Sequence, residues 1–182
     1  MNVKHLIIAF GLFAMLSACH TKTSTTDNPL LTESTLDFYA PPFDKILPEH
    51  FMPAIKQGIA EQQAEIDSII RNPETPTFAN TILAYEKSGR SLTRASTLLS
   101  VLTSANGTDE LRKVEEEATP LLSAHHDALL LNEKLFARVK AVYDADTLLT
   151  GEDQRLTEVL YREFVHAGAL LSAESRDSLS KI

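Results

Sequence analysis

Two prolines that interrupt the chain between long helical patterns constrain its fold more than any other feature. Pro73 and Pro76 push the residues before them out of helical geometry. Thr77 then offers a side-chain oxygen to the free amides of a helix that begins at Phe78. The corner at Asn72–Ile82 therefore predicts the end of one helix and the start of another.

Apolar residues recur at steps of three and four on both sides of this corner, which is the spacing of one helix face. Convincing strand-like alternation is lacking in the sequence, so we expect an all-α chain of antiparallel helical hairpins forming a bundle. The expected helices run from Pro53 to Arg71, from Phe78 to Thr103, from Thr108 with a bend near Glu116 caused by Pro120, from Asn132 to Asp144, over 150–171, and onward from Ser172.

Small residues interrupt the apolar face of the helix expected from Phe78 to Thr103. Gly89 and Ser96 lie at positions that bulky residues hold elsewhere on this face. They would permit close approach of a neighbouring helix, which is the interpretation we favour. Alternatively, Gly89 is a weak point that costs about 1 kcal/mol in helix stability.

The charge balance excludes nucleic acid as an expected partner. The formal net charge is −8, and no run of basic residues alternates with aromatic ones. With 43% apolar residues, the chain of 182 residues is nevertheless able to form a core of ordinary size.

The first 18 residues read as an export signal, with Lys4 before an apolar run that is shorter than the roughly 20 residues of a membrane-spanning helix. The segment ends in Leu-Ser-Ala before Cys19, which resembles a bacterial lipobox, so we expect Cys19 to be lipidated. The alternative is an ordinary secretory signal with a coincidental cysteine. Lipidation implies an exported protein, lipid-anchored on the periplasmic side or at the outer membrane.

Three segments follow from this interpretation. They are the signal at 1–18, the lipidated cysteine with a flexible tether at 19–38, and a helical domain at 39–182. Tyr39–Pro53 opens the domain as an extended strap, which Phe43 and Ile46 are expected to pin to the surface. The last helical pattern has hardly begun at Ile182, so we expect the chain to be truncated within a larger protein.

Residues capable of chemistry are few, and they predict no catalytic, cofactor-binding or metal site. No histidine is followed by glutamate, so the His-Glu-x-x-His motif is absent. We expect His125 to be buried and hydrogen-bonded. Glu163 and His166 have the Glu-x-x-His spacing of di-iron bundles, but the spacing occurs once, so an ion pair of Glu163 with Arg155 or Arg162 is favoured instead. Residues 115–117, all glutamate, are expected to face solvent.

Several motifs occur in an order that resembles a known family. They include Pro41-Pro42-Phe43-Asp44-Lys45-Ile46, Pro76-Thr77-Phe78-Ala79-Asn80-Thr81-Ile82 and Leu131-Asn132-Glu133-Lys134-Leu135-Phe136. From about residue 28 to its end, the chain resembles the N-terminal part of the peptidyl-dipeptidase branch of the thimet oligopeptidase family of zinc metallopeptidases.

This resemblance implies a helical clamshell that encloses a channel and releases C-terminal dipeptides from oligopeptides. It places the chain in the N-terminal lid. The family's zinc is held by two histidines of His-Glu-x-x-His and a downstream glutamate, and this sequence contains none of those positions. We therefore expect a fragment that is inactive and binds no zinc alone, with the catalytic region and oligopeptides as partners of the complete protein. The alternative is a non-catalytic helical lipoprotein that binds peptides or another partner.

Overall fold

A computed structural model describes residues 28–145, 149–172 and 175. In this part of the chain every regular element is helical, which confirms the all-α prediction. The α-helices are α1 (Phe51–Arg71), α2 (Leu83–Glu86), α3 (Arg90–Asn106), α4 (Asp109–Leu130), α5 (Glu133–Asp144) and α6 (Gly151–His166). The signal at 1–18, Cys19 and most of the helix expected after Ser172 lie outside the described residues.

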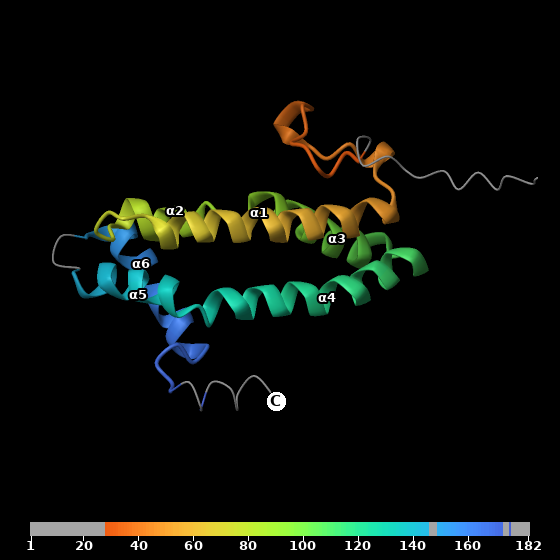
Figure 1. The fold of residues 1–182 in the computed structure, drawn as a ribbon. Helices are drawn as coiled ribbons and strands as arrows, with labels where there is room; N and C mark the ends of the chain where they lie inside the picture. The colour runs from red at the N-terminus through yellow and green to blue at the C-terminus, as the bar shows by residue number, and fades with distance from the viewer. Residues whose placement is uncertain (1–27, 146–148, 173–174, 176–182) are drawn as a thin grey trace, which may run out of the picture.

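Figure 1 shows α1 and α4 as two long helices along the molecule, with α3 packed on α1 and with α5 and α6 gathered at one end. Because short connections join them, the long helices reverse direction in turn (Figure 1). Two apolar cores result. The α3 core lies among α1, α3 and α4 and contains Leu30, Phe51, Ala54, Ile55, Leu92, Ala95, Leu98, Leu99, Leu111 and Ala118.

The second cluster, here called the α5–α6 core, fills the other end of the molecule. Phe136 and Phe164 stack at its centre with ring centroids 5.8 Å apart. The buried members of this core are Ile66, Ile69, Ile82, Leu129, Leu130, Leu135, Phe136, Val139, Val142, Leu160 and Phe164.

The proline corner is built as the sequence predicts. Thr77 accepts a hydrogen bond from the amide of Asn80 at 3.2 Å, and Asn80 Oδ1 accepts one from the amide of Thr77 at 2.8 Å. This reciprocal capping starts a one-turn π-helix, η5 (Phe78–Ile82), which leads into α2. The predicted helix start at Phe78 and the predicted end of α1 at Arg71 are both confirmed.

The prediction of one helix from Phe78 to Thr103 is wrong. Gly89 has φ +68°, a left-handed conformation that ends the helical run after α2, and α3 starts anew at Arg90. Gly89 is therefore a break that glycine permits. An added Cβ at Gly89 would stand 2.4 Å from the side chain of Gln62, so α1 does come close at this break. A second close approach lies at Gly58 of α1, where an added Cβ would stand 2.7 Å from the Cα of Leu92.

Predicted N-caps position two later helices. Thr108 Oγ1 accepts from the amide of Leu111 at 3.3 Å before α4, and Asn132 Oδ1 accepts from the amides of Lys134 and Leu135, each at 3.1 Å, before α5. Helix α4 continues through Pro120.

The last described helix and the start of the domain differ from expectation. Helix α6 ends at His166 rather than at residue 171, and Leu171 is exposed. At the N-terminal end, packing begins before Tyr39. Leu30 lies in the α3 core, and Asn28 Nδ2 donates to the backbone oxygen of His50 at 2.8 Å, so the last part of the tether expected at 19–38 is docked.

The strap expected as an extended run over Tyr39–Pro53 forms short 3₁₀ turns instead, and the residues just before it belong to the same segment, so the strap is taken from here on as residues 33–50. Its turns are η2 (Asp37–Tyr39), η3 (Phe43–Lys45) and η4 (Pro48–His50). Ile46 packs against the α3 core as predicted. Phe43 does not, because 57% of its surface is exposed.

Candidate functional site

The residues singled out from the sequence do not converge on a reaction centre. Glu163 and His166 lie near the exposed end of α6. The predicted ion pair of Glu163 is wrong. The guanidinium groups of Arg155 and Arg162 lie 3.2 Å and 4.0 Å from the carboxylate of Glu158 instead.

Metal binding finds no support among the described residues, which contain no group of three or more His, Cys, Asp or Glu side chains able to hold an ion. They therefore do not fit the zinc that the resemblance implies. In the same part of the chain no helix is long and apolar enough to cross a membrane.

A polar layer separates the two apolar cores and consists of Gln62, Glu65, Ser88, the backbone of Gly89, and His125. Gln62 lies on α1 between the residues that α1 gives to each core, and His125 has the same position on α4. His125 is buried and its Nε2 lies 2.9 Å from Gln62 Oε1, so the prediction of a buried, hydrogen-bonded histidine is confirmed.

The direction of these hydrogen bonds follows from their chemistry. An amide oxygen only accepts, so the Nε2–H of His125 donates to Gln62. Gln62 Nε2 then donates to Ser88 Oγ at 3.2 Å, and Ser88 Oγ donates to the backbone oxygen of Tyr85 at 2.7 Å. Beside this chain, Glu65 accepts from the amide of Gly89 at 2.7 Å. The layer thereby joins α4 and α1 to the break between α2 and α3.

Titration in this region favours neutral side chains. Burial lowers the pKa of His125, and the charge of the adjacent His126 lowers it further. Burial also raises the pKa of Tyr85 to about 12, with smaller contributions from Glu163 and Glu86. Tyr85 is therefore protonated at neutral pH. The layer positions helices and contains no nucleophile aligned with a base.

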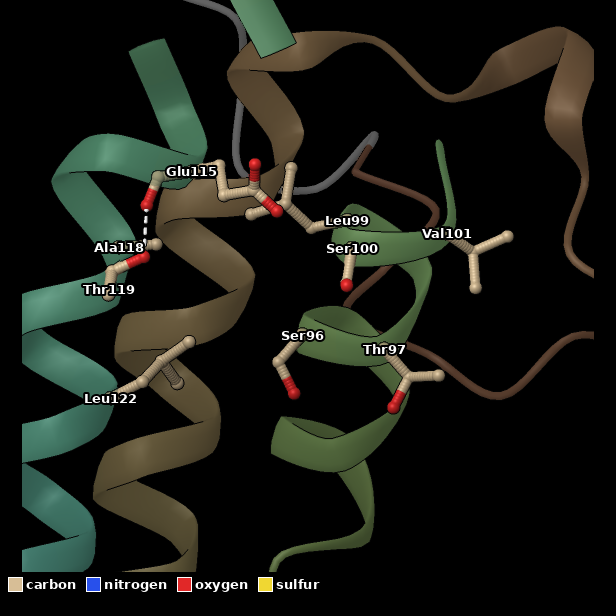
Figure 2. Close-up of a pocket in the computed structure, with 9 residues that line it drawn as sticks. All are labelled: Ser96, Thr97, Leu99, Ser100, Val101, Glu115, Ala118, Thr119 and Leu122. Atoms are coloured by element: carbon tan, nitrogen blue, oxygen red, sulfur yellow. Dashed lines mark hydrogen bonds between the residues drawn. The ribbon is translucent and has the colours of Figure 1, made fainter. Parts of the chain in front are cut away.

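A groove of about 440 Å³ lies between α3 and α4. In Figure 2, Ser96 and Ser100 of α3 lie across the groove from Glu115, Ala118, Thr119 and Leu122 of α4, with α1 behind them. The buried side chains of Leu99 and Ala118 make the inner part of the groove apolar, whereas hydroxyl groups line its rims.

The hydroxyl groups along this groove are directed mainly to their own helices. Thr119 Oγ1 donates to the backbone oxygen of Glu115 at 2.7 Å (Figure 2), and Ser96 Oγ donates to that of Thr93 at 3.3 Å. Glu115 is half-buried, whereas Glu116 and Glu117 are exposed, as predicted for a solvated face. Small side chains therefore lie on both rims of the groove.

Sequence reasoning missed Arg138 of α5, which binds the proline corner. Its guanidinium donates to the backbone oxygen of Asn72 at 2.9 Å, to that of Glu74 at 3.4 Å, and to Asn80 Oδ1 at 3.3 Å. No local signal identifies this role because the partners lie more than 50 residues away in the chain.

The sequence of this helical bundle is similar to those of known peptidases. No protein-family model matches the chain. It is 42% identical over 157 residues to dipeptidyl carboxypeptidase of Escherichia coli, a match that covers 85% of this chain and 23% of that protein. It is 39% identical to dipeptidyl carboxypeptidase of Salmonella typhimurium, over 84% of this chain and 23% of that protein.

A more distant relative extends the likeness beyond one kind of peptidase. Oligopeptidase A of Escherichia coli is 29% identical over 158 residues, which are 85% of this chain and 22% of that protein. The chain thus spans less than a quarter of the length of these curated relatives. Together, the helical fold and these matches show that the chain belongs to the thimet oligopeptidase family of peptidases and represents an N-terminal part of it.

Proposed function

We propose that this chain is the N-terminal helical lid of a peptidyl-dipeptidase that releases C-terminal dipeptides from oligopeptides. The observation that carries the proposal is the identity of 42% and 39% with two dipeptidyl carboxypeptidases over most of the chain. The lower identity of 29% with oligopeptidase A favours the peptidyl-dipeptidase branch over its neighbours.

The lid limits access to the reaction centre and does not perform the reaction. Long antiparallel helices around two apolar cores form a rigid cover, and the polar layer keeps α1, α3 and α4 in register. The groove between α3 and α4 contributes a peptide-sized hollow. Zinc, with its activated water, belongs to the His-Glu-x-x-His region of the complete protein, which this sequence does not contain. The present chain alone is therefore proposed to be inactive.

Genomic DNA and an activity assay test this function. The reading frame is expected to continue beyond the codon of Ile182 and to encode His-Glu-x-x-His. The purified complete protein should release dipeptides from the C-terminus of an oligopeptide, and a chelator should abolish that release. The 182-residue chain is the matched control and should release none. A stop codon after Ile182 followed by unrelated sequence would instead support the alternative, a non-catalytic lipoprotein that binds peptides.

We also propose that the protein is exported and anchored to a membrane through lipid on Cys19. The short apolar segment before Leu-Ser-Ala-Cys and the single cysteine of the chain support this proposal. Mass spectrometry of the protein from its own host should find a diacylglyceryl group on Cys19 as the first residue. Substitution Cys19→Ser should move the protein from the membrane to the soluble fraction. Recovery of unmodified Cys19 in a soluble, cleaved protein would favour an ordinary secretory signal.

A further inference from the structure

The strap exposes an unusual number of large apolar side chains. We call the side chains of Leu36, Phe38, Tyr39, Phe43 and Leu47 the strap face. Phe38 is 100% exposed and Tyr39 70%, and about half of the surface of each of the other three is exposed. A soluble domain seldom leaves so many large apolar groups together in water unless they bind something.

The turn that carries the two most exposed rings has a defined shape. Phe38 and Tyr39 have φ of 57° and 56°, a left-handed conformation that bulky residues rarely adopt. Hydrogen bonds close the turn, from the amide of Tyr39 to Leu36 O at 2.9 Å and from Ser34 Oγ to Ala40 O at 2.6 Å. The rings are thus presented on a shaped loop, which projects beside the helices in Figure 1.

Both ends of the strap contact the helices. The side chains in its middle are therefore exposed although the strap is held on the domain. Before the turn, Arg94 of α3 donates to the backbone oxygen of Leu30 at 3.3 Å, and Arg90 lies 3.8 Å from the carboxylate of Glu33. After the turn, Ile46 packs on the α3 core and His50 is buried.

The charge of the strap favours a protein surface over an anionic membrane as its binding partner. Between residues 33 and 49 the only basic side chain is Lys45, whereas the acidic ones are Glu33, Asp37, Asp44 and Glu49. Arg90 of α3 pairs with Glu33, and the other three acidic side chains still outnumber Lys45. Anionic lipid headgroups repel such a surface. An apolar protein surface with lysine or arginine at its rim complements it in both polarity and charge.

We infer that the strap face is where the rest of the peptidase polypeptide packs against this lid. The inference rests on the proposed function, and its physical basis is the length of the relatives. This chain spans 23% of the two dipeptidyl carboxypeptidases, so the complete protein provides ample further surface to cover the strap. The occupant is an apolar hollow, rimmed by basic side chains, on the polypeptide that follows Ile182.

Oxidation by hydroxyl radicals, read by mass spectrometry, measures whether the rings are covered. In the 182-residue chain, Phe38 and Tyr39 should be oxidised rapidly, whereas the fully buried Phe51 serves as the protected control. In the complete protein, both rings should be oxidised several-fold more slowly. Equal rates in the two proteins would overturn the inference. So would protection that appears only when vesicles of phosphatidylglycerol and phosphatidylethanolamine are added, because that result assigns the strap face to a membrane.

Substitutions provide an independent test. Phe38→Ser with Tyr39→Ser should lower the melting temperature of the complete protein and leave that of the 182-residue chain unchanged, because both rings are exposed in the chain. Leu121→Ser, at a residue that is 39% exposed on α4, is the matched control. An equal effect of the double substitution on both proteins would show a role within this domain and contradict the inference.

The two proposals fail in different ways. Absence of a longer reading frame refutes the proposed function before either measurement begins. An active complete peptidase whose strap face stays exposed, and whose stability ignores the double substitution, refutes only the inference about packing.

Discussion

At the scale of single residues, the surroundings of His125 determine its protonation state in the folded chain. It is buried between the two cores and donates to Gln62, which in turn donates to Ser88. A charged imidazole in this position loses hydration without gaining an acidic partner from the hydrogen-bonded chain. The neutral form therefore suits the folded state, and the polar layer is sensitive to pH.

We predict that the free energy of unfolding falls as the pH drops below about 6.5, the ordinary pKa of histidine. The pKa of His125 is lowered in the folded chain, so the unfolded chain binds more protons in this range, and stability rises with pH. His125→Gln keeps a donor for Gln62 but does not titrate, and should make the pH dependence shallower. Denaturant titrations between pH 5 and pH 7.5 would measure it, with His166→Gln, on an exposed histidine of α6, as control. An unchanged slope in His125→Gln would contradict the prediction.

Substitution of Arg138 should lower the stability of the chain, because its side chain connects α5 to the proline corner. Arg138→Met keeps the apolar stem and removes the hydrogen bonds to Asn72, Glu74 and Asn80. We expect a loss of about 2 kcal/mol in the free energy of unfolding, typical of hydrogen bonds that a charged group makes. Urea denaturation would measure it, and Lys134→Met, on an exposed residue one turn earlier, should change stability little.

At the scale of elements, α1 and α3 pack closely, and the contact depends on a glycine within α1. The missing side chain of Gly58 lets the backbone of Leu92 approach. Helix propensity alone favours alanine over glycine by about 1 kcal/mol. Close packing and propensity therefore predict opposite effects of one substitution.

We predict that Gly58→Ala destabilises the chain, because a Cβ 2.7 Å from the Cα of Leu92 forces the two backbones apart. Overpacking of this kind typically costs about 1 to 3 kcal/mol, which exceeds the gain in propensity. Thermal unfolding followed by circular dichroism would report the change. Gln57→Ala, on the exposed neighbour, controls for propensity. A higher melting temperature for Gly58→Ala would show that α3 yields and would refute the packing argument.

At the scale of the whole molecule, the two cores lie at opposite ends of α1 with the polar layer between them. The α5–α6 core contains the stacked rings of Phe136 and Phe164 and depends on α5, α6 and the corner at η5. The α3 core depends on α1, α3 and α4. Because few apolar contacts connect the cores, one end of the molecule can lose stability before the other.

Phe164→Ala should therefore destabilise mainly the end of the molecule that contains the α5–α6 core. Its side chain is fully buried, so removal is expected to cost about 3 to 5 kcal/mol locally. Native-state hydrogen exchange should show faster exchange of amides in α5 and α6, with protection retained near Leu92 and Leu99 of α3. Leu99→Ala is the reciprocal variant and should release α3 first. Uniform acceleration across all helices would indicate one cooperative unit instead.

The sequence by itself determined the helical class, the corner and most helix limits, because these depend on neighbours a few residues apart. Thr77, Thr108 and Asn132 cap where their side chains reach amides two or three residues ahead. The ordered motifs also led to the family, which the identity to known peptidases supports.

Only the tertiary structure decided how Gly89, Gly58 and Arg138 act. Gly89 lies against Gln62, Gly58 lies against Leu92, and Arg138 donates to Asn72. In each pair the two residues are far apart in the sequence. Spacing in the sequence made Gly89 part of one helix face, but its left-handed backbone, which belongs to the polar layer, divides the helix in two. Glu163 likewise does not form the expected ion pair, because the guanidinium groups of Arg155 and Arg162 lie against the carboxylate of Glu158 on the same helix. Local rules choose the elements, whereas contacts between distant residues decide what each glycine and charge does.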